Sequence, residues 1–128
     1  MKIQIELDES VLEDVFVTAI EGGSNYWYFL SDDAVRLIRK AVPREEEPCI
    51  SVATYKAVMR GVEVPIHDAE DEEEQIGLIS LETMQDRLQA LINSGDKWAL
   101  ERHMDEEGDA DSADVVFQYL AMGEAVYG

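Results

Sequence analysis

Two runs of carboxylates are the side chains in this sequence whose spacing most clearly offers chemistry. The first run is Glu70, Asp71, Glu72, Glu73 and Glu74, and the second is Asp105, Glu106, Glu107, Asp109 and Asp111. Duplex DNA carries about one negative charge per 1.7 Å of its axis, and the proteins that bind it match this charge with lysine and arginine grooves. Carboxylates held at a similar density can occupy such a groove, so both runs predict contact with a basic partner. The alternative is that both are solvated loops, the usual structure of a charged run.

The sequence contains no recognised metal-binding or catalytic motif. The stretch DEEGDADSAD is rich in the oxygen ligands that calcium prefers, but it lacks the spacing of an EF-hand loop. His67 and His103 are isolated in the sequence, and the single cysteine, Cys49, excludes a multi-cysteine zinc site. Ser24 lies in EGGSN, which is neither a nucleophile elbow nor a phosphate-binding loop. We therefore expect a protein that is not an enzyme and that holds no metal or other cofactor.

A different chemistry is offered by EGGSNYWYFL, residues 21–30, where consecutive aromatic residues follow two glycines. The glycines predict an abrupt end to the preceding helix, and an extended chain beyond them would alternate its rings between core and surface. One interpretation is a corner that anchors the core. The other is a contact surface or a ligand pocket formed by Tyr26 and Trp27, because tyrosine and tryptophan dominate many interfaces. A nucleotide-like ligand would require the few arginines to gather at that pocket.

The charge of the whole chain favours a basic protein partner over nucleic acid. Its 128 residues include 29 acidic and 10 basic ones, a net charge of −19. Residues 62–128 hold 18 of the acidic and three of the basic residues, a net charge of −15. Such a field repels nucleic acid and anionic membranes, so we expect direct contact with neither. Alternatively, the acidity serves solubility or adaptation to high salt.

Other features of the composition predict where the protein acts. The single cysteine and the lack of an apolar signal segment near residue 1 indicate the cytoplasm. No apolar run approaches the roughly 20 residues of a membrane-spanning helix.

Hydrophobic periodicity places the candidate residues on an α+β fold. Alternation predicts three short strands, over residues 2–7, 62–68 and 76–80, and Pro65 predicts that the second of them lies at a sheet edge. Helical spacing predicts about five helices, over residues 8–20, 31–42, 51–61, 81–95 and 112–123, with a further turn or two over 96–104. Ser31 and Ser80 are the expected N-caps, and residues 105–114 are expected to form an acidic loop. The sequence thus predicts a single domain over residues 1–128, a small antiparallel sheet of about three strands with about five helices packed on it.

Three segments, EGGSNYWY, ISLETMQDRLQAL and ADVVFQYLAMGEAVYG, resemble a group of small acidic proteins of unassigned function encoded by bacteriophages, prophages and other mobile elements. The resemblance leaves residues 31–60 unmatched. It implies a genomic setting in which small acidic proteins often inhibit host defence, some of them as nucleic-acid mimics. With the charge, this predicts a phage or mobile-element inhibitor of the anti-CRISPR kind that binds a basic host protein or nucleic-acid-binding complex. A small-ligand binder at the aromatic corner and a halophilic or structural accessory protein are the alternatives.

Overall fold

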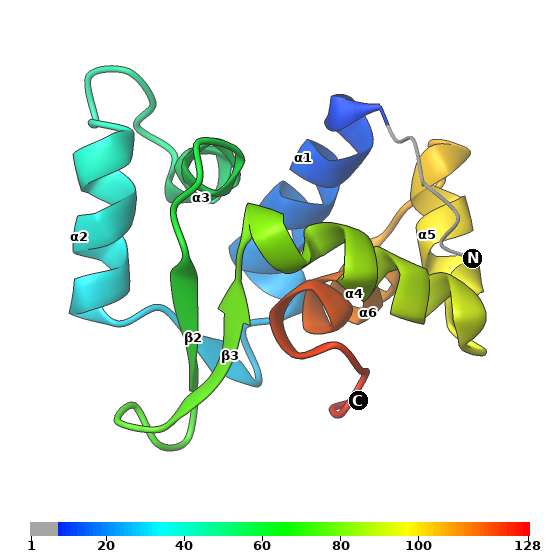
Figure 1. Cartoon of the computed structure of the whole chain (residues 1–128). Coiled ribbons are helices and arrows are strands. Elements are labelled where there is room, and N and C mark those ends of the chain that lie inside the picture. Colours follow the sequence, from blue (N-terminus) through cyan, green and yellow to red (C-terminus); the bar gives the residue numbers. More distant parts are fainter. Residues whose placement is uncertain (1–7) are drawn as a thin grey trace.

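The structure is a computed structural model that describes residues 8–128, and the strand predicted over residues 2–7 lies outside this range. The described chain folds into six α-helices and a three-stranded antiparallel sheet (Figure 1), so the predicted α+β class is confirmed. The elements in order are α1 (Glu9–Thr18), the π-helical turn η1 (Ala19–Gly23), β1 (Tyr28–Phe29), α2 (Asp32–Ala41), α3 (Ile50–Met59), β2 (Val64–Asp68), β3 (Gln75–Ile79), α4 (Leu81–Asn93), α5 (Lys97–Met104) and α6 (Ala110–Met122). None of the described helices has the length and apolar character needed to cross a membrane.

Serine side chains fix the start of two helices. Ser31 Oγ accepts the Ala34 N–H at 3.1 Å at the start of α2, and Ser80 Oγ accepts the Thr83 N–H at 3.2 Å at the start of α4. Each bond satisfies a backbone donor that has no partner within the helix. Both predicted N-caps are therefore confirmed.

The last helix begins earlier than the sequence pattern indicated. The Asp109 carboxylate accepts the Ser112 N–H, and the Ser112 hydroxyl accepts the Asp109 N–H, which together form a capping box. This pair starts α6 at Ala110, so the prediction of a loop over residues 105–114 is wrong in its second half. Asp111 and Asp114 are helical residues.

The sheet has the order β1-β2-β3, with β2 in the centre. The prediction that Pro65 lies on an edge strand is therefore wrong. A proline is tolerated in this central strand because β1 pairs only with Asp68 and His67 and ends before it reaches Pro65.

Helix α6 occupies the centre of the core. It packs against α1, α4, α5 and β3, and its side chains Val116, Phe117 and Leu120 are buried. The approach of β3 is so close that a Cβ on Gly77 would lie 2.6 Å from the Ala121 carbonyl oxygen. Helices α2 and α3 pack on each other beside β2, away from α5 (Figure 1). Polar side chains on α6 therefore lie where most elements of the fold meet.

Candidate functional site

The aromatic stretch turns back onto one buried carboxylate, that of Asp114, which is 7% exposed. Its Oδ1 accepts the Ser24 hydroxyl at 2.7 Å and the Trp27 indole N–H at 2.7 Å. Its Oδ2 accepts the Tyr26 hydroxyl at 2.5 Å and the Gln118 amide at 3.2 Å. These donors replace the water that a carboxylate loses on burial, so Asp114 holds the aromatic stretch against α6.

Gln118 extends this arrangement to the C-terminal segment. Its side-chain amide donates to the Tyr127 carbonyl at 3.1 Å, and its side-chain oxygen accepts the N–H groups of Val126 and Tyr127 at 2.8 and 2.9 Å. The Tyr127 ring stacks on Trp27, with ring centroids 5.4 Å apart and an interplanar angle of 11°. We call this unit the Asp114 hub, and its members are Ser24, Tyr26, Trp27, Asp114, Gln118 and Tyr127.

The hub separates the two aromatic residues that the sequence placed at a contact surface. Trp27 is 2% exposed and belongs to the core, whereas Tyr26 is 53% exposed. The rings do not simply alternate, because the backbone N–H of Trp27 bonds the Ser24 carbonyl at 3.1 Å and bends the chain before β1 begins. Burial of its hydroxyl, followed by the bond to Asp114 and the charge of that carboxylate, raises the pKa of Tyr26 to about 12. Of Tyr26 and Trp27, only Tyr26 is exposed enough to contact a partner.

A cavity of about 590 Å³ opens beside the hub. Three aromatic rings and three carboxylates contribute to its lining: Tyr26, Trp98, Tyr127, Asp96, Asp111 and Asp114. Among the residues that the structure describes, no lysine, arginine or histidine lines it. A phosphate group would meet only negative charge there, so the lining disfavours the nucleotide-like ligand considered from the sequence.

The first carboxylate run forms the turn between β2 and β3, and all of its side chains, from Glu70 to Glu74, are exposed. The Asp68 N–H donates to the Glu74 carbonyl at 3.0 Å, and the Glu74 N–H donates to the Asp71 carbonyl at 3.0 Å. The carboxylates of Asp68 and Asp71 accept the N–H groups of Glu70 and Glu73 at 2.9 and 3.2 Å. We call residues 69–74 the hairpin turn, and these bonds give it a defined conformation.

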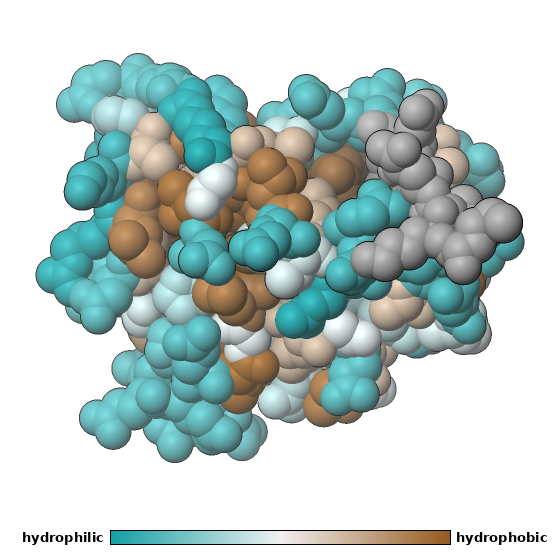
Figure 2. Space-filling model, viewed as in Figure 1, coloured by the Kyte–Doolittle hydropathy of each residue, from teal (hydrophilic) through white to brown (hydrophobic). Residues whose placement is uncertain are grey.

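The hairpin turn lies next to the hub. The Ala69 N–H donates to the Trp27 carbonyl at 2.9 Å. Burial raises the pKa of Tyr127, and the charges of Asp68, Glu74 and Glu70 raise it further. Figure 2 shows the turn as a hydrophilic projection at the lower left, where Figure 1 places the connection between β2 and β3. The acidic turn and the aromatic cavity thus belong to neighbouring parts of the molecule.

The second carboxylate run is divided by the start of α6. Its first three members, Asp105, Glu106 and Glu107, are exposed in the turn between α5 and α6. Asp109 caps α6 and pairs with Arg102 at 3.0 Å. Asp111 lies in the first turn of the helix and lines the cavity. The run therefore does not form one continuous acidic surface, and only Asp111 joins the site near the hub.

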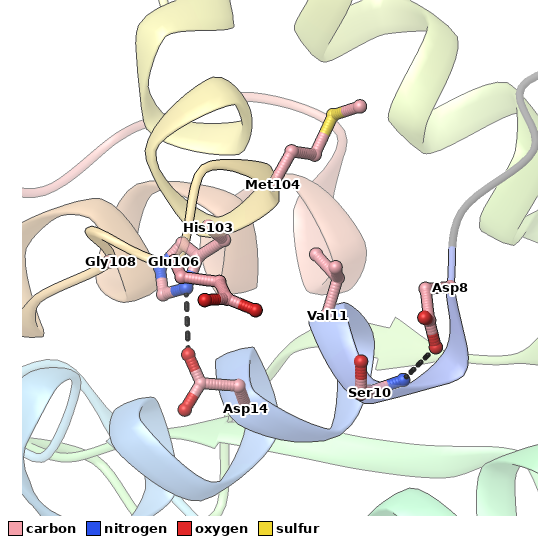
Figure 3. Close-up of a pocket in the computed structure, with 8 residues that line it drawn as sticks. All are labelled: Asp8, Ser10, Val11, Asp14, His103, Met104, Glu106 and Gly108. Atoms are coloured by element: carbon pink, nitrogen blue, oxygen red, sulfur yellow. Dashed lines mark hydrogen bonds and ion pairs between the residues drawn. The ribbon is translucent and has the colours of Figure 1, made fainter.

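A hydrogen-bonded Asp–His–Ser chain lies between α1, α5 and α6. His103 Nδ1 is 3.0 Å from Asp14 Oδ2 (Figure 3), and His103 Nε2 is 3.0 Å from Ser112 Oγ. This is the connectivity of a serine-protease triad. His103 is isolated in the sequence but not in the fold, and no sequence pattern revealed its partner because Asp14 lies 89 positions away.

His103 and Ser112 are buried, whereas the Asp14 side chain is largely exposed. Ser112 has no exposed surface, and its hydroxyl already accepts the Asp109 N–H at 2.8 Å. Gly108 lies against the imidazole ring, so that a Cβ there would be 2.1 Å from His103 Nδ1. The neighbouring cavity of about 410 Å³ is lined by His103 and by the carboxylates of Asp8, Asp14 and Glu106, but not by Ser112 (Figure 3). Ser112 Oγ is thus buried outside this cavity, and the bonds among Asp14, His103 and Ser112 connect α1, α5 and α6.

The remaining candidates of the sequence are dispersed. Within residues 8–128, no group of three or more histidine, cysteine, aspartate or glutamate side chains is arranged to hold a metal ion. Cys49 is an exposed free thiol at the start of α3. His67 lies in β2, away from the cavity lining.

Comparison with known proteins identified no relative of this chain. No protein-family model matches the chain, and neither the curated proteins nor the solved structures yielded a match. The resemblance to small phage and mobile-element proteins stays a prediction.

Proposed function

We propose that this protein is a non-enzymatic binding protein that occupies the basic groove of a nucleic-acid-handling complex. The observation that carries this proposal is the hairpin turn, with its consecutive exposed carboxylates and its closed set of backbone bonds. No ion pair joins these carboxylates to a lysine or arginine of the described chain. Unpaired charges on a turn whose backbone is already ordered leave less chain freedom to be lost on binding, which favours association with a basic surface.

The basic side chains of the protein do not neutralise this turn. They are concentrated in and around α2 and α3, where they contact nearby groups. Arg39 donates to the carbonyls of Glu47 and Pro48 at 2.6 and 2.9 Å, and Arg60 forms an ion pair with Glu46. The negative field at the hairpin turn is therefore left for a partner.

The setting we propose follows from the sequence resemblance. A phage or mobile element would use such a protein in the cytoplasm of its host to inhibit a defence complex that handles nucleic acid, as anti-CRISPR proteins do. The carboxylates of the hairpin turn then stand in for backbone phosphates.

The proposal is tested by identifying the complexes that the immobilised protein and two charge-matched variants of it retain from bacterial lysate. Glu72→Lys/Glu73→Lys reverses two charges of the hairpin turn and spares Asp71, whose carboxylate closes it. Glu45→Lys/Glu63→Lys changes the net charge equally at exposed residues outside both carboxylate runs. We expect the unmodified protein and the control variant to retain a nucleic-acid-binding complex at low salt, and the turn variant to lose it.

The retained complex is then tested for duplex binding by fluorescence anisotropy. We expect the unmodified protein to displace labelled duplex DNA or RNA, and the displacement to weaken as salt rises. Equal retention by both variants, or a retained complex that binds duplex equally well with the protein present, would contradict the proposal.

A further inference from the structure

The cavity beside the Asp114 hub combines exposed aromatic side chains with a carboxylate, Asp111, that pairs with no described lysine or arginine. Tyr26 and Trp98 are among the most exposed large hydrophobic side chains of the described residues. Asp111 is exposed and forms no ion pair with a described lysine or arginine. The volume of about 590 Å³ lies within the range of roughly 300–1,000 Å³ that is typical of ligand sites. These features are those of a binding site for a cation with an extended apolar surface.

The three carboxylates of the lining differ in their capacity to accept new donors. Asp114 is occupied by the donors of the hub. Asp96 accepts the Tyr119 hydroxyl at 2.9 Å. No hydrogen bond from another described side chain engages the Asp111 carboxylate, which lies in the first turn of α6. An incoming donor therefore finds its free acceptor at Asp111.

Aromatic faces and carboxylates together select an organic cation. The negative face of an aromatic ring attracts a cation, and a carboxylate adds a charge-assisted hydrogen bond. A guanidinium group satisfies both, because it is planar, stacks on rings and donates along its edge. The chain contains an example, since the Arg102 guanidinium lies 5.5 Å from the centroid of the Trp98 ring and pairs with Asp109. Trp98 therefore already packs against one guanidinium group, and an incoming one would have to stack on the part of the ring that Arg102 leaves uncovered.

We propose that this cavity takes an arginine side chain of the basic partner, an inference that rests on the proposed function. Tyr26 and Trp98 stack on the guanidinium group, and Asp111 accepts its N–H groups. The bond from Tyr26 to Asp114 fixes the ring before the partner arrives, which reduces the entropy lost on binding. The neighbouring hairpin turn, bonded to Trp27 through Ala69, contacts the other basic groups of the same partner.

The two tryptophans make this proposal measurable without the partner. Trp98 lines the cavity, whereas the Trp27 indole N–H is bonded within the hub, so their indole signals in a ¹⁵N–¹H spectrum report on different places. We would titrate N-acetyl-arginine methylamide at constant ionic strength. The parallel titrations use the citrulline analogue, which has a similar shape without the charge, and tetramethylammonium. We expect a saturable shift of the Trp98 signal with the arginine probe and none with the citrulline probe.

A pair of matched variants ties the signal to the cavity. Asp111→Asn should weaken binding of the arginine probe about fivefold, the loss expected for one partly exposed charge pair. Asp105→Asn removes the same charge from the turn between α5 and α6, outside the cavity, and should leave binding unchanged. The Trp27 signal shows in each variant that the hub has kept its structure.

Three outcomes would overturn the assignment. They are a shift that does not saturate, equal shifts with the arginine and citrulline probes, and saturation by tetramethylammonium without saturation by the arginine probe. Because the titration needs no partner, its failure leaves retention through the hairpin turn unaffected. A failed retention experiment likewise leaves a saturable arginine titration standing.

Discussion

Two acidic segments, the hairpin turn and residues 108–114, use most of their carboxylates in opposite ways, and Asp111 is the exception in the second segment. In the hairpin turn, the carboxylates are exposed and form no ion pair with a described cation. In residues 108–114, Asp109 caps α6 and Asp114 is buried beneath converging donors. The role of a carboxylate therefore depends on which donors the fold brings to it. A buried carboxylate oxygen needs these donors because it has lost its hydrogen bonds to water.

The comparison also separates stability from recognition. Carboxylates that accept backbone and side-chain donors stabilise the fold, and their removal leaves those donors unsatisfied. Exposed like charges slightly destabilise the fold by repulsion, but they remain free for a partner. Substitutions in the two segments should therefore affect different measurements.

The largest effect on stability is expected at Asp114. Replacement by alanine leaves the buried donors of Ser24 and Trp27 without their acceptor, so Asp114→Ala should lower the free energy of unfolding by about 3–5 kcal/mol. Urea denaturation followed by circular dichroism measures this change. The control is Asp111→Ala, an exposed residue of the same helix, with an expected change within about 0.5 kcal/mol. Similar losses in the two variants would show that Asp114 is not the centre of the hub.

A smaller but substantial effect is expected at Gly108. A methyl group there would collide with the His103 ring, so Gly108→Ala should destabilise the fold by about 1–3 kcal/mol, the usual effect of overpacking. Gly95→Ala is the matched control, because a Cβ at Gly95 meets no atom within 4 Å. Thermal unfolding of both variants gives the comparison. Equal melting temperatures would contradict the close contact between Gly108 and His103.

The cap at Asp109 should make part of the stability depend on pH. The backbone N–H of Ser112, followed by the Ser112 hydroxyl, holds the pKa of Asp109 below its ordinary value of 3.8. The unfolded chain therefore binds this proton first, so the stabilisation is present above about pH 4 and is lost as the pH falls through the lower folded value. The difference in urea midpoint between the unmodified protein and Asp109→Asn should accordingly shrink as the pH falls below about 4.

The control for this titration is Glu72→Gln in the hairpin turn. Its carboxylate caps no helix, so the variant should follow the acid profile of the unmodified protein. A constant difference between the unmodified protein and Asp109→Asn across the acid range would show that the cap does not depend on the charge of Asp109.

The smallest effect on stability is expected in the hairpin turn itself. Glu72→Lys/Glu73→Lys relieves repulsion between neighbouring carboxylates, so its free energy of unfolding should stay within about 0.5 kcal/mol of the unmodified protein. Any increase in the free energy of unfolding should be larger at low salt, because the screening length falls from about 30 Å at 0.01 M salt to about 10 Å at 0.1 M. Urea denaturation at the two salt concentrations measures the change. A large loss of stability would show that these side chains are needed for folding, and would end the contrast between the two segments.

Local features of the fold could be predicted because their causes are local. The caps at Ser31 and Ser80 act within one helical turn, and the strands that became β2 and β3 lie in alternating stretches joined by a polar turn. The early start of α6 could also have been predicted, because Asp109 and Ser112 have the spacing of a capping box. The short β1 was missed because two residues contain too little alternation to predict a strand.

The α+β class, the strong negative charge and the acidic composition of the hairpin turn can all be read from the amino-acid sequence. The burial of Asp114, the bond between His103 and Asp14 and the position of Tyr26 beside an acidic cavity follow from tertiary packing. The physical reason is separation along the chain: the Ser24 and Trp27 donors to Asp114 lie 90 and 87 positions away from it. Composition specifies which groups need partners, and the packing of α6 against distant segments specifies which of them obtain one.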